Sequence, residues 1–353
     1  MTTLSQTMSG VQLIGHGGLG RLVWNDAIPV PAPRAGEVLV RVLAAGVNNT
    51  DLNTRIGWYA KEVTTATADV TDETIESGGW AGALKFPLIQ GGDLCGEVVA
   101  LGEGVTGFAH GMRVTCPLNQ PSPTAENPVH FEVLGSEYDG AFAQYCAVKA
   151  RHLYDVSSSP LSDIEIGAMP CAYGTALNLL VRAQVDPHDQ ALITGASGGV
   201  GLAAVQLARL RGASVTAVTS PAKAQSVLAA GATSVLGRDE KPQIGGYSVV
   251  IDVAGGAAFN ALLEALQPGG RLATAGAIAG PLVETDLRTV YLKDLTIFGC
   301  TYQPEAVFAE LVDLIRRDSV RPLVSKTYAL RDIALAQADF ASKRYPGKLV
   351  LIP

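Results

Sequence analysis

Residues 190–201 read Gln-Ala-Leu-Ile-Thr-Gly-Ala-Ser-Gly-Gly-Val-Gly, an apolar run followed by a glycine-rich turn. Residues 202–210 then carry apolar side chains at helical spacing, and residues 213–218 fit a second strand. Glycines in such a turn let the backbone approach a pyrophosphate, which the amino end of the following helix stabilises. The stretch therefore predicts a Rossmann unit that binds a dinucleotide. The residues expected at the pyrophosphate are Ser197, Gly198, Gly199 and Val200.

The residues after the second strand indicate which dinucleotide binds. An acid about 20 residues past the glycines usually holds the ribose hydroxyls of NAD, but no acid lies between Asp189 and Asp239. The strand ends instead at Thr219 and Ser220, and Lys223 follows. Hydroxyls and an ammonium suit a 2′-phosphate, which a carboxylate would repel. These residues favour NADPH over NADH, unless Lys223 simply lies on an exposed helix face.

Composition and length bound the class of protein. The 353 residues exceed what one core comfortably fills, so two domains are expected. A net charge of −7 and the lack of a basic stripe argue against a nucleic-acid partner. The five cysteines include no C-x-x-C pair, and no segment resembles a signal peptide or a membrane span. We expect a cytoplasmic protein with a small-molecule substrate and no membrane partner.

The pattern of secondary structure changes along the chain. Short β-type runs, the clearest at 37–45, 94–101 and 112–116, lie between Gly, Pro and Asn residues in the first 150 positions. From about residue 166 helices and strands alternate, which predicts a parallel sheet covered by helices. The elements expected there are 166–182, the glycine-turn unit, 221–230, 248–253, 257–266, 270–276 and 295–299, followed by a helix at 304–317 and a closing strand at 348–352.

Residues 60–85 interrupt the first part of the chain. They are rich in Thr, Ala and acids, and they fit either a disordered surface insertion or a lid over a site. Residues 72–77 fit a short capped helix.

Several motifs together resemble one family. They read Ala-Gly-Val-Asn-Asn-Thr-Asp at 45–51, Gly-Met-Arg-Val at 111–114, Gly-Ala-Phe-Ala-Gln-Tyr at 140–145 and Gly-Lys-Leu-Val at 347–350. With the glycine turn, they resemble the medium-chain dehydrogenase/reductase superfamily, in its zinc-free branch of quinone oxidoreductase-like proteins. The resemblance implies a GroES-like β domain at 1–154 and 305–353 and a doubly wound Rossmann domain, which binds NADPH, at 155–304. The active site would then lie in the cleft between these domains.

The resemblance also bears on metal binding. Zinc-dependent relatives place a Cys where this chain has Asn48 and a His where it has Gly92, and only Cys171 keeps a usable ligand. A catalytic zinc needs three protein ligands. We therefore expect no metal, and we expect Cys171 to be a small buried residue.

Without zinc, hydride transfer needs another way to stabilise charge on the acceptor, which conjugated carbonyls and quinones allow. Residues 48–59 are similar to a pattern of enoyl thioester reductases in which the residue matching Tyr59 donates the proton. The residue matching Asn48 lies near the nicotinamide there, and it either contacts the substrate or orients the cofactor. The alternative for Tyr59 is an aromatic that only packs beside Trp58, and Asp51 fits a turn cap.

The resemblance extends to the nicotinamide. The residues implied near it are Thr175, Ala277, Ile278, Cys300 and Thr301. Pairing of edge residues 295–299 would make a homodimer. We thus expect an NADPH-dependent, zinc-independent oxidoreductase that delivers hydride to a quinone or an α,β-unsaturated carbonyl. The alternatives are an alcohol dehydrogenase with an altered metal site and a non-catalytic NADPH-binding protein.

Overall fold

The computed structural model describes residues 4–70, 78–80 and 82–353. The chain divides into two compact units. The β-rich unit comprises residues 1–61, 71–171 and 304–353, and the Rossmann unit comprises residues 62–70 and 172–303. The short helix expected at 72–77 lies outside the described residues.

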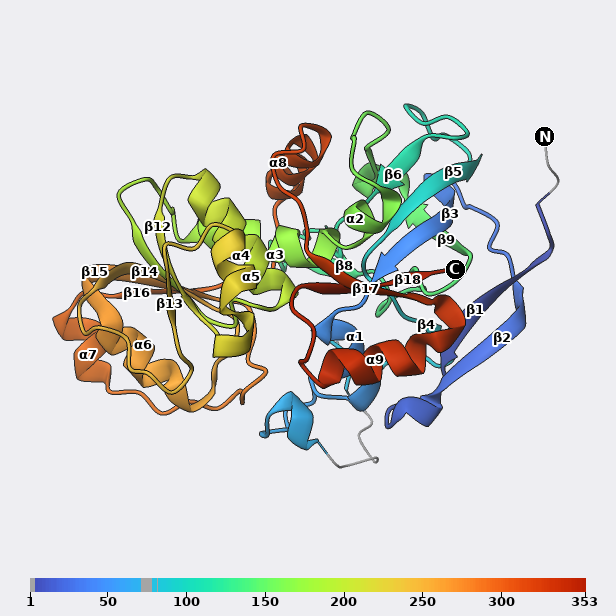
Figure 1. Ribbon diagram of the computed structural model, residues 1–353. Helices are drawn as coiled ribbons and strands as arrows, with labels where there is room; N and C mark the ends of the chain where they lie inside the picture. Colours follow the sequence, from blue (N-terminus) through green and yellow to red (C-terminus); the bar gives the residue numbers. More distant parts are fainter. Residues whose placement is uncertain (1–3, 71–77, 81) are drawn as a thin grey trace. The chain divides into compact units, whose positions relative to one another are not determined.

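The Rossmann unit is built on a parallel six-stranded sheet, with helices packed around it (Figure 1). Its strand order is β13-β12-β11-β14-β15-β16, so the chain winds outward from β11 in one direction and from β14 in the other. Val249, Val250 and Ile251 of β14 are fully buried, as expected for a central strand covered on both faces. The elements are β11 (Gln190–Ile193), α4 (Gly199–Leu210), β12 (Ser214–Val218), α5 (Ala224–Ala229), β13 (Ser234–Leu236), β14 (Tyr247–Asp252), α6 (Phe259–Ala265), β15 (Leu266–Thr274), α7 (Leu287–Leu292) and β16 (Thr296–Gly299).

The β-rich unit is organised around β3 (Glu37–Gly46), which pairs with β5, β9 and β18. Because β18 is the last strand of the chain, a strand from the first 50 residues and the carboxyl-terminal strand are neighbours in one sheet (Figure 1). The order of this sheet is β10-β6-β5-β3-β18-β17. The other strands are β1 (Thr7–Leu13), β2 (Leu22–Pro29), β4 (Leu88–Ile89), β5 (Cys95–Leu101), β6 (Arg113–Thr115), β7 (Asn119–Pro121), β8 (Phe131–Val133), β9 (Tyr145–Lys149), β10 (Tyr154–Asp155), β17 (Val324–Ala329) and β18 (Lys348–Ile352).

Short helices complete the β-rich unit: α1 (Asn49–Ile56), α2 (Asp163–Gly167), α8 (Glu305–Arg316) and α9 (Ile333–Ala341). The single helix expected at 166–182 is wrong, since it is two helices, α2 and α3 (Pro170–Arg182). Pro170 lacks the N–H that a continuous helix would need and starts α3 instead. The expectation of one helix and one strand after residue 304 also omitted β17 and α9.

The boundary between the two units lies after residue 171, whereas the sequence predicted it after residue 154. Residues 155–171 cluster with the β-rich unit, because α2 packs on β3 with Gly167 directly against Ala44. A Cβ at Gly167 would lie 2.8 Å from the Ala44 Cβ, so this contact needs glycine.

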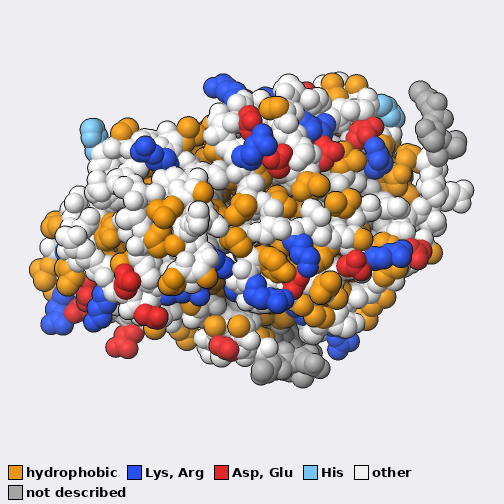
Figure 2. Space-filling model, in the orientation of Figure 1, with side chains coloured by type: hydrophobic (Ala, Val, Ile, Leu, Met, Phe, Trp, Pro, Cys, Tyr) orange, Lys and Arg blue, Asp and Glu red, His pale blue; other side chains and the backbone are white. Residues whose placement is uncertain are grey.

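Within the described residues, no helix is both long enough and apolar enough to cross a membrane. Charged side chains of both signs are interspersed on the face shown in Figure 2.

Candidate active site

The glycine turn lies between β11 and α4 in the Rossmann unit. Gly195 has φ +55°, a left-handed conformation that glycine adopts without strain. A Cβ at Gly201 would lie 2.2 Å from the Gly195 carbonyl oxygen, so the first turn of α4 packs directly on the turn. Ser197 is buried, Gly198 is exposed, and Gly199 and Val200 are partly exposed at the start of α4. The first N–H groups of the helix are thus presented at the carboxyl edge of the sheet, where dinucleotides bind.

Thr219, Ser220 and Lys223 follow β12, and Arg238 follows β13, at the same edge of the sheet. The Thr219 N–H donates to the Leu236 carbonyl at 3.0 Å, which ties the ends of the two strands together. The Thr219 hydroxyl is buried without a hydrogen-bond partner. Burial and the nearby positive charge of Arg238 both lower the pKa of Lys223. The two neighbouring cations, Lys223 and Arg238, fit a phosphorylated ribose better than a bare one.

The residues expected at the nicotinamide follow strands on the other side of β11. Ala277 and Ile278 come after β15, and Cys300 and Thr301 come after β16. Thr175 lies on α3, partly exposed. The Ile278 carbonyl accepts a hydrogen bond from the Thr67 N–H at 3.2 Å. Part of the 60–85 segment therefore contacts a residue expected at the cofactor.

In the β-rich unit, Asn48 belongs to a buried polar cluster. The Lys348 ammonium donates to the Asp93 carboxylate at 2.9 Å, to the Val47 carbonyl at 3.0 Å and to the Asn48 Oδ1. The Asn48 Nδ2 donates to the same Asp93 oxygen at 2.9 Å. The other Asp93 oxygen accepts from the Cys171 N–H at 2.6 Å. Both polar ends of the Asn48 amide are thus occupied within the unit, which favours an orienting role over direct contact with substrate.

Asp51 lies beside this cluster and accepts a hydrogen bond from the Asn48 N–H at 2.7 Å, so it caps the start of α1. Burial raises the pKa of Asp51 to about 7, and the negative charge of Asp93 raises it further, although the Asn48 N–H and Lys348 oppose these effects.

This pKa predicts how stability depends on pH. The Asp51 carboxyl keeps its proton up to about pH 7 when folded, whereas an unfolded Asp ionises near pH 3.9. The folded state therefore binds more protons between these values, and the free energy of unfolding falls as the pH rises through this window, by on the order of 3 kcal/mol. In Asp51→Asn this loss should be absent. Denaturant unfolding of both proteins at pH 5 and pH 8 measures the difference, and an equal decline in both would contradict the prediction.

Tyr59 follows the end of α1. Gly57 terminates the helix with φ 77°, and the Trp58 N–H donates to the Asn53 carbonyl at 2.8 Å. The Tyr59 ring is stacked on Trp80, with centroids 5.1 Å apart and planes at 10°, and it meets Trp58 edge-on. Trp80 belongs to the 60–85 segment, so part of that segment packs on the candidate proton donor.

The surroundings of Tyr59 keep its hydroxyl protonated. Burial raises the pKa of Tyr59 well above its usual value, whereas a hydrogen bond from the Asn53 side chain lowers it. The charges of Cys171 and Asp51 are close enough to raise this pKa further. Trp80 also meets Phe131 edge-on, and both pack against Leu118, Val133 and Cys171. A neutral phenol thus lies beside an apolar, aromatic group of side chains.

Residues 48, 92 and 171 do not form a set of zinc ligands. A Cβ at Gly92 would lie 1.8 Å from a Leu118 methyl group, so the Leu118 side chain fills the space that a ligand there would use. Cys171 is buried as expected. Within the described parts of the chain, no group of three or more His, Cys, Asp or Glu side chains could hold a metal ion.

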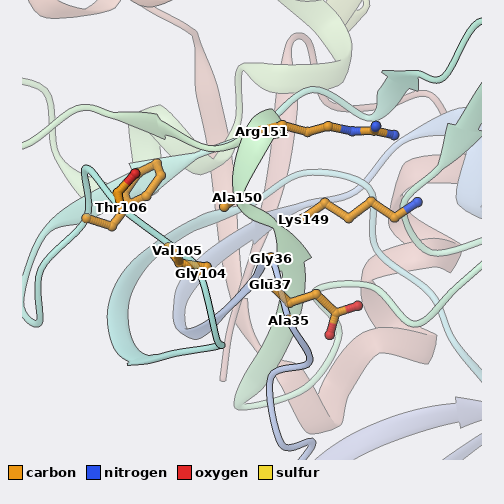
Figure 3. Close-up of a pocket in the computed structure, with 10 residues that line it drawn as sticks. Ala35, Gly36, Glu37, Gly104, Val105, Thr106, Lys149, Ala150 and Arg151 are labelled. Carbon is orange, nitrogen blue, oxygen red and sulfur yellow. The ribbon is translucent and has the colours of Figure 1, made fainter.

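A separate surface hollow of ≈ 550 Å³ lies in the β-rich unit, lined by residues 35–37, 104–106, 108 and 149–151 (Figure 3). Lys149 pairs with Glu132, and the Arg151 guanidinium donates to His152 at 3.0 Å. None of its lining residues is among those expected at the cofactor or the substrate.

The sequence did not indicate the roles of several residues that the structure places at the site. Lys348 stood within a quoted motif and Asp93 follows Gly92 directly, but nothing in the sequence showed that the two side chains pair. Arg238 follows a short strand, β13, that was not predicted. Asn53 and Trp80 gained significance only through their contacts with Tyr59.

Comparisons with known proteins agree with a GroES-like domain and a Rossmann domain in one chain. Residues 34–158 match the family "Alcohol dehydrogenase GroES-like domain", and residues 199–317 match "Zinc-binding dehydrogenase". An acryloyl-coenzyme A reductase of Metallosphaera sedula is 30% identical, with 91% of this chain and 93% of the relative covered. A quinone oxidoreductase of Rattus norvegicus is 25% identical over the full length of both chains. A solved structure, a putative alcohol dehydrogenase from Sinorhizobium meliloti 1021, is 40% identical, has a TM-score of 0.88, and covers 100% of this chain and 98% of its own.

The chain belongs to the medium-chain dehydrogenase/reductase superfamily, with a GroES-like domain and a Rossmann domain. It is therefore an oxidoreductase of this type, and members of the superfamily bind nicotinamide cofactors. One of the two family descriptions names zinc, but the residues present at 48, 92 and 171 do not fit that metal.

Proposed function

We propose that the protein is an NADPH-dependent, zinc-independent reductase that delivers hydride to a quinone or an α,β-unsaturated carbonyl. The observation that carries the proposal is in the β-rich unit, where an Asn48–Asp93–Lys348 cluster stands in place of metal ligands. A neutral phenol, Tyr59, lies nearby. A phenol can protonate a carbon acceptor, whereas alcohol oxidation in zinc-type dehydrogenases uses the metal as a Lewis acid.

The cofactor would be held by the Rossmann unit and would supply the hydride. Ser197, Gly198, Gly199 and Val200 would meet its pyrophosphate, and Thr175, Ala277, Ile278, Cys300 and Thr301 would surround its nicotinamide. Thr219, Ser220, Lys223 and Arg238 would hold its 2′-phosphate. In the β-rich unit, the hydroxyl of Tyr59 would return a proton to the substrate, and Asn48 would orient the loop before α1.

The choice of cofactor can be tested at the two cations. Lys223→Ala and Arg238→Ala should each raise the Kd for NADPH about 10-fold, since each removes a charge-assisted hydrogen bond, and should leave the Kd for NADH nearly unchanged. Titration of protein fluorescence with each nucleotide measures this. Lys241→Ala removes an exposed lysine a few positions beyond Arg238 and is the control. Equal losses for NADPH and NADH would refute the 2′-phosphate assignment.

The acceptor can be identified by NADPH oxidation with a panel of quinones, enals and enoyl thioesters. The similarity to an acryloyl-coenzyme A reductase and a quinone oxidoreductase supports including both classes. Oxidation of none of them would contradict the proposed function. Metal analysis of protein prepared without chelator belongs with the assay, because stoichiometric zinc in an active preparation would contradict zinc independence.

We further propose a homodimer formed through β16, the edge strand of the parallel sheet. Ile297 of this strand and Leu287, Tyr291 and Leu292 of α7 are all exposed, at 43%, 68%, 61% and 71%. Exposed apolar side chains beside unpaired strand edges commonly mark association sites. Sedimentation velocity should give twice the chain mass, and a monomer would contradict it.

The five free, buried cysteines support the cytoplasmic location, which stays a prediction.

A further inference from the structure

Tyr59 has a difficulty as a proton donor. A phenol that gives up its proton becomes a phenolate, and burial disfavours that charge, as the raised pKa of Tyr59 reflects. A buried phenol can be an effective acid only where a neighbouring group stabilises the charge that it acquires.

A chain of hydrogen bonds supplies such a group. The Lys343 ammonium donates to the Asn49 Oδ1 at 3.3 Å, and the Asn49 Nδ2 donates to the Asn53 Oδ1 at 3.2 Å. The Asn53 Oδ1 accepts from Asn49, and the hydrogen bond of the Asn53 side chain to Tyr59 lowers the pKa of the phenol. Only a donor to the phenol oxygen has that effect, so the Asn53 Nδ2 donates to Tyr59. Every donor in the chain points toward the phenol oxygen, and a lysine stands at its far end.

The same arrangement leaves the phenol hydrogen available. Asn53 donates to the oxygen and does not accept the O–H hydrogen, which can then be directed at a substrate. The ring cannot easily turn away, since the Trp80 indole covers one of its faces and Trp58 meets its edge. Asn53 is itself buried on α1, only 5% exposed, so its amide is held in place.

We propose that Asn53 is a positioning residue that stabilises the phenolate which Tyr59 becomes on protonating the substrate. This inference rests on the proposed function. When bound, the reduced nicotinamide would supply the hydride that adds to the β-carbon of the conjugated acceptor, and it would itself be oxidised. The O–H bond of Tyr59 then breaks, its proton forms a C–H bond at the α-carbon, and the electron pair stays on the phenolate oxygen. Water returns the proton afterwards.

The test measures the effect of Asn53→Leu twice, once in the wild-type protein and once in the Tyr59→Phe variant. With Tyr59 present, Asn53→Leu should lower kcat for an enone about 10-fold to 100-fold, the value of a hydrogen bond to a charged group, with KM little changed. In Tyr59→Phe the same substitution should have no further effect, because no phenolate forms. A loss of equal size in both backgrounds would show a merely structural role and overturn the inference.

A second variant guards against loss of folding. Asn53→Asp has nearly the same shape and keeps an oxygen for Asn49, but it offers the phenol an acceptor in place of a donor. It should lose at least as much activity as Asn53→Leu. Asn25→Ala is the matched control and should keep full activity. It removes the amide hydrogen bond from Asn25 of β2 to Gln12 of β1.

A measurement without turnover separates this inference from the proposed function. In protein carrying ring-fluorinated tyrosine, whose phenol is more acidic, the ¹⁹F resonance that is missing from Tyr59→Phe reports ionisation of Tyr59. Its midpoint should move to higher pH in Asn53→Leu, and an unchanged midpoint would overturn the inference. If the wild-type protein reduces no acceptor while the midpoint still moves in Asn53→Leu, only the proposed function is contradicted.

Discussion

Replacing Tyr59 with Phe is expected to lower kcat for an α,β-unsaturated carbonyl about 100-fold to 10,000-fold, the range that general acid catalysis contributes. The substitution removes only the hydroxyl, and the stack on Trp80 and the edge contact with Trp58 need only the ring. Binding of NADPH should therefore be close to that of wild type. Steady-state kinetics and nucleotide titration on the same preparation measure both quantities.

The effect should depend on the acceptor. A reduced quinone carries its charge on oxygen, which takes a proton from water readily, so Tyr59→Phe should affect quinone turnover much less. Tyr154→Phe is the matched control, because Tyr154 is also a partly buried phenol of the β-rich unit. It lies in β10 and packs on Phe308 of α8, away from the residues expected at the substrate. An enone kcat that stays at the wild-type value would remove Tyr59 from the mechanism.

Replacing Lys348 with Met should lower the free energy of unfolding by about 3–5 kcal/mol, the usual loss when one member of a buried ion pair is removed. Lys348 is 2% exposed and Asp93 is fully buried, so the carboxylate left behind has little water to solvate it. Denaturant unfolding followed by circular dichroism measures the change. Activity should fall too, since the ammonium also holds Asn48.

Two further variants separate the buried charge from loss of packing. The double variant Asp93→Asn/Lys348→Met leaves no unpaired charge and should recover part of the stability. Arg41→Met breaks the half-exposed pair of Arg41 with Glu97 and should cost at most about 1 kcal/mol. A Lys348→Met protein as stable as wild type would contradict the role assigned to the pair.

The fold was largely predictable because its determinants are local. Residues 190–218 combine a strand, a glycine turn and a helix within one short segment, and each pattern has its own periodicity. The division at residue 171 was not predictable, because it depends on how α2 packs on β3, far away in sequence. The break before Pro170 could have been inferred from the proline alone.

The candidate site was predictable only in part. Resemblance selected Asn48 and Tyr59 because flanking motifs fix their place in the sequence, and Asn48 and Gly57 flank α1 in the structure. Partners distant in sequence were not accessible, since Lys348 lies 300 positions from Asn48. Arg238 was missed for a similar reason, because its closeness to Lys223 depends on strand pairing.

The contact between Gly57 and Gly78 has a consequence for how this chain can change. A Cβ at Gly78 would lie 2.2 Å from the Gly57 Cα, so the backbone meets itself on either side of the intervening residues. Loops whose ends are already joined tolerate changes in length, since the entropy of closing them grows slowly with the number of residues. Tyr59 and Trp80 sit just past the two sides of this junction. Changes in the length of the sequence between them should therefore leave the stacked rings in place, whereas replacement of the residues around Thr67 would also remove its hydrogen bond to Ile278.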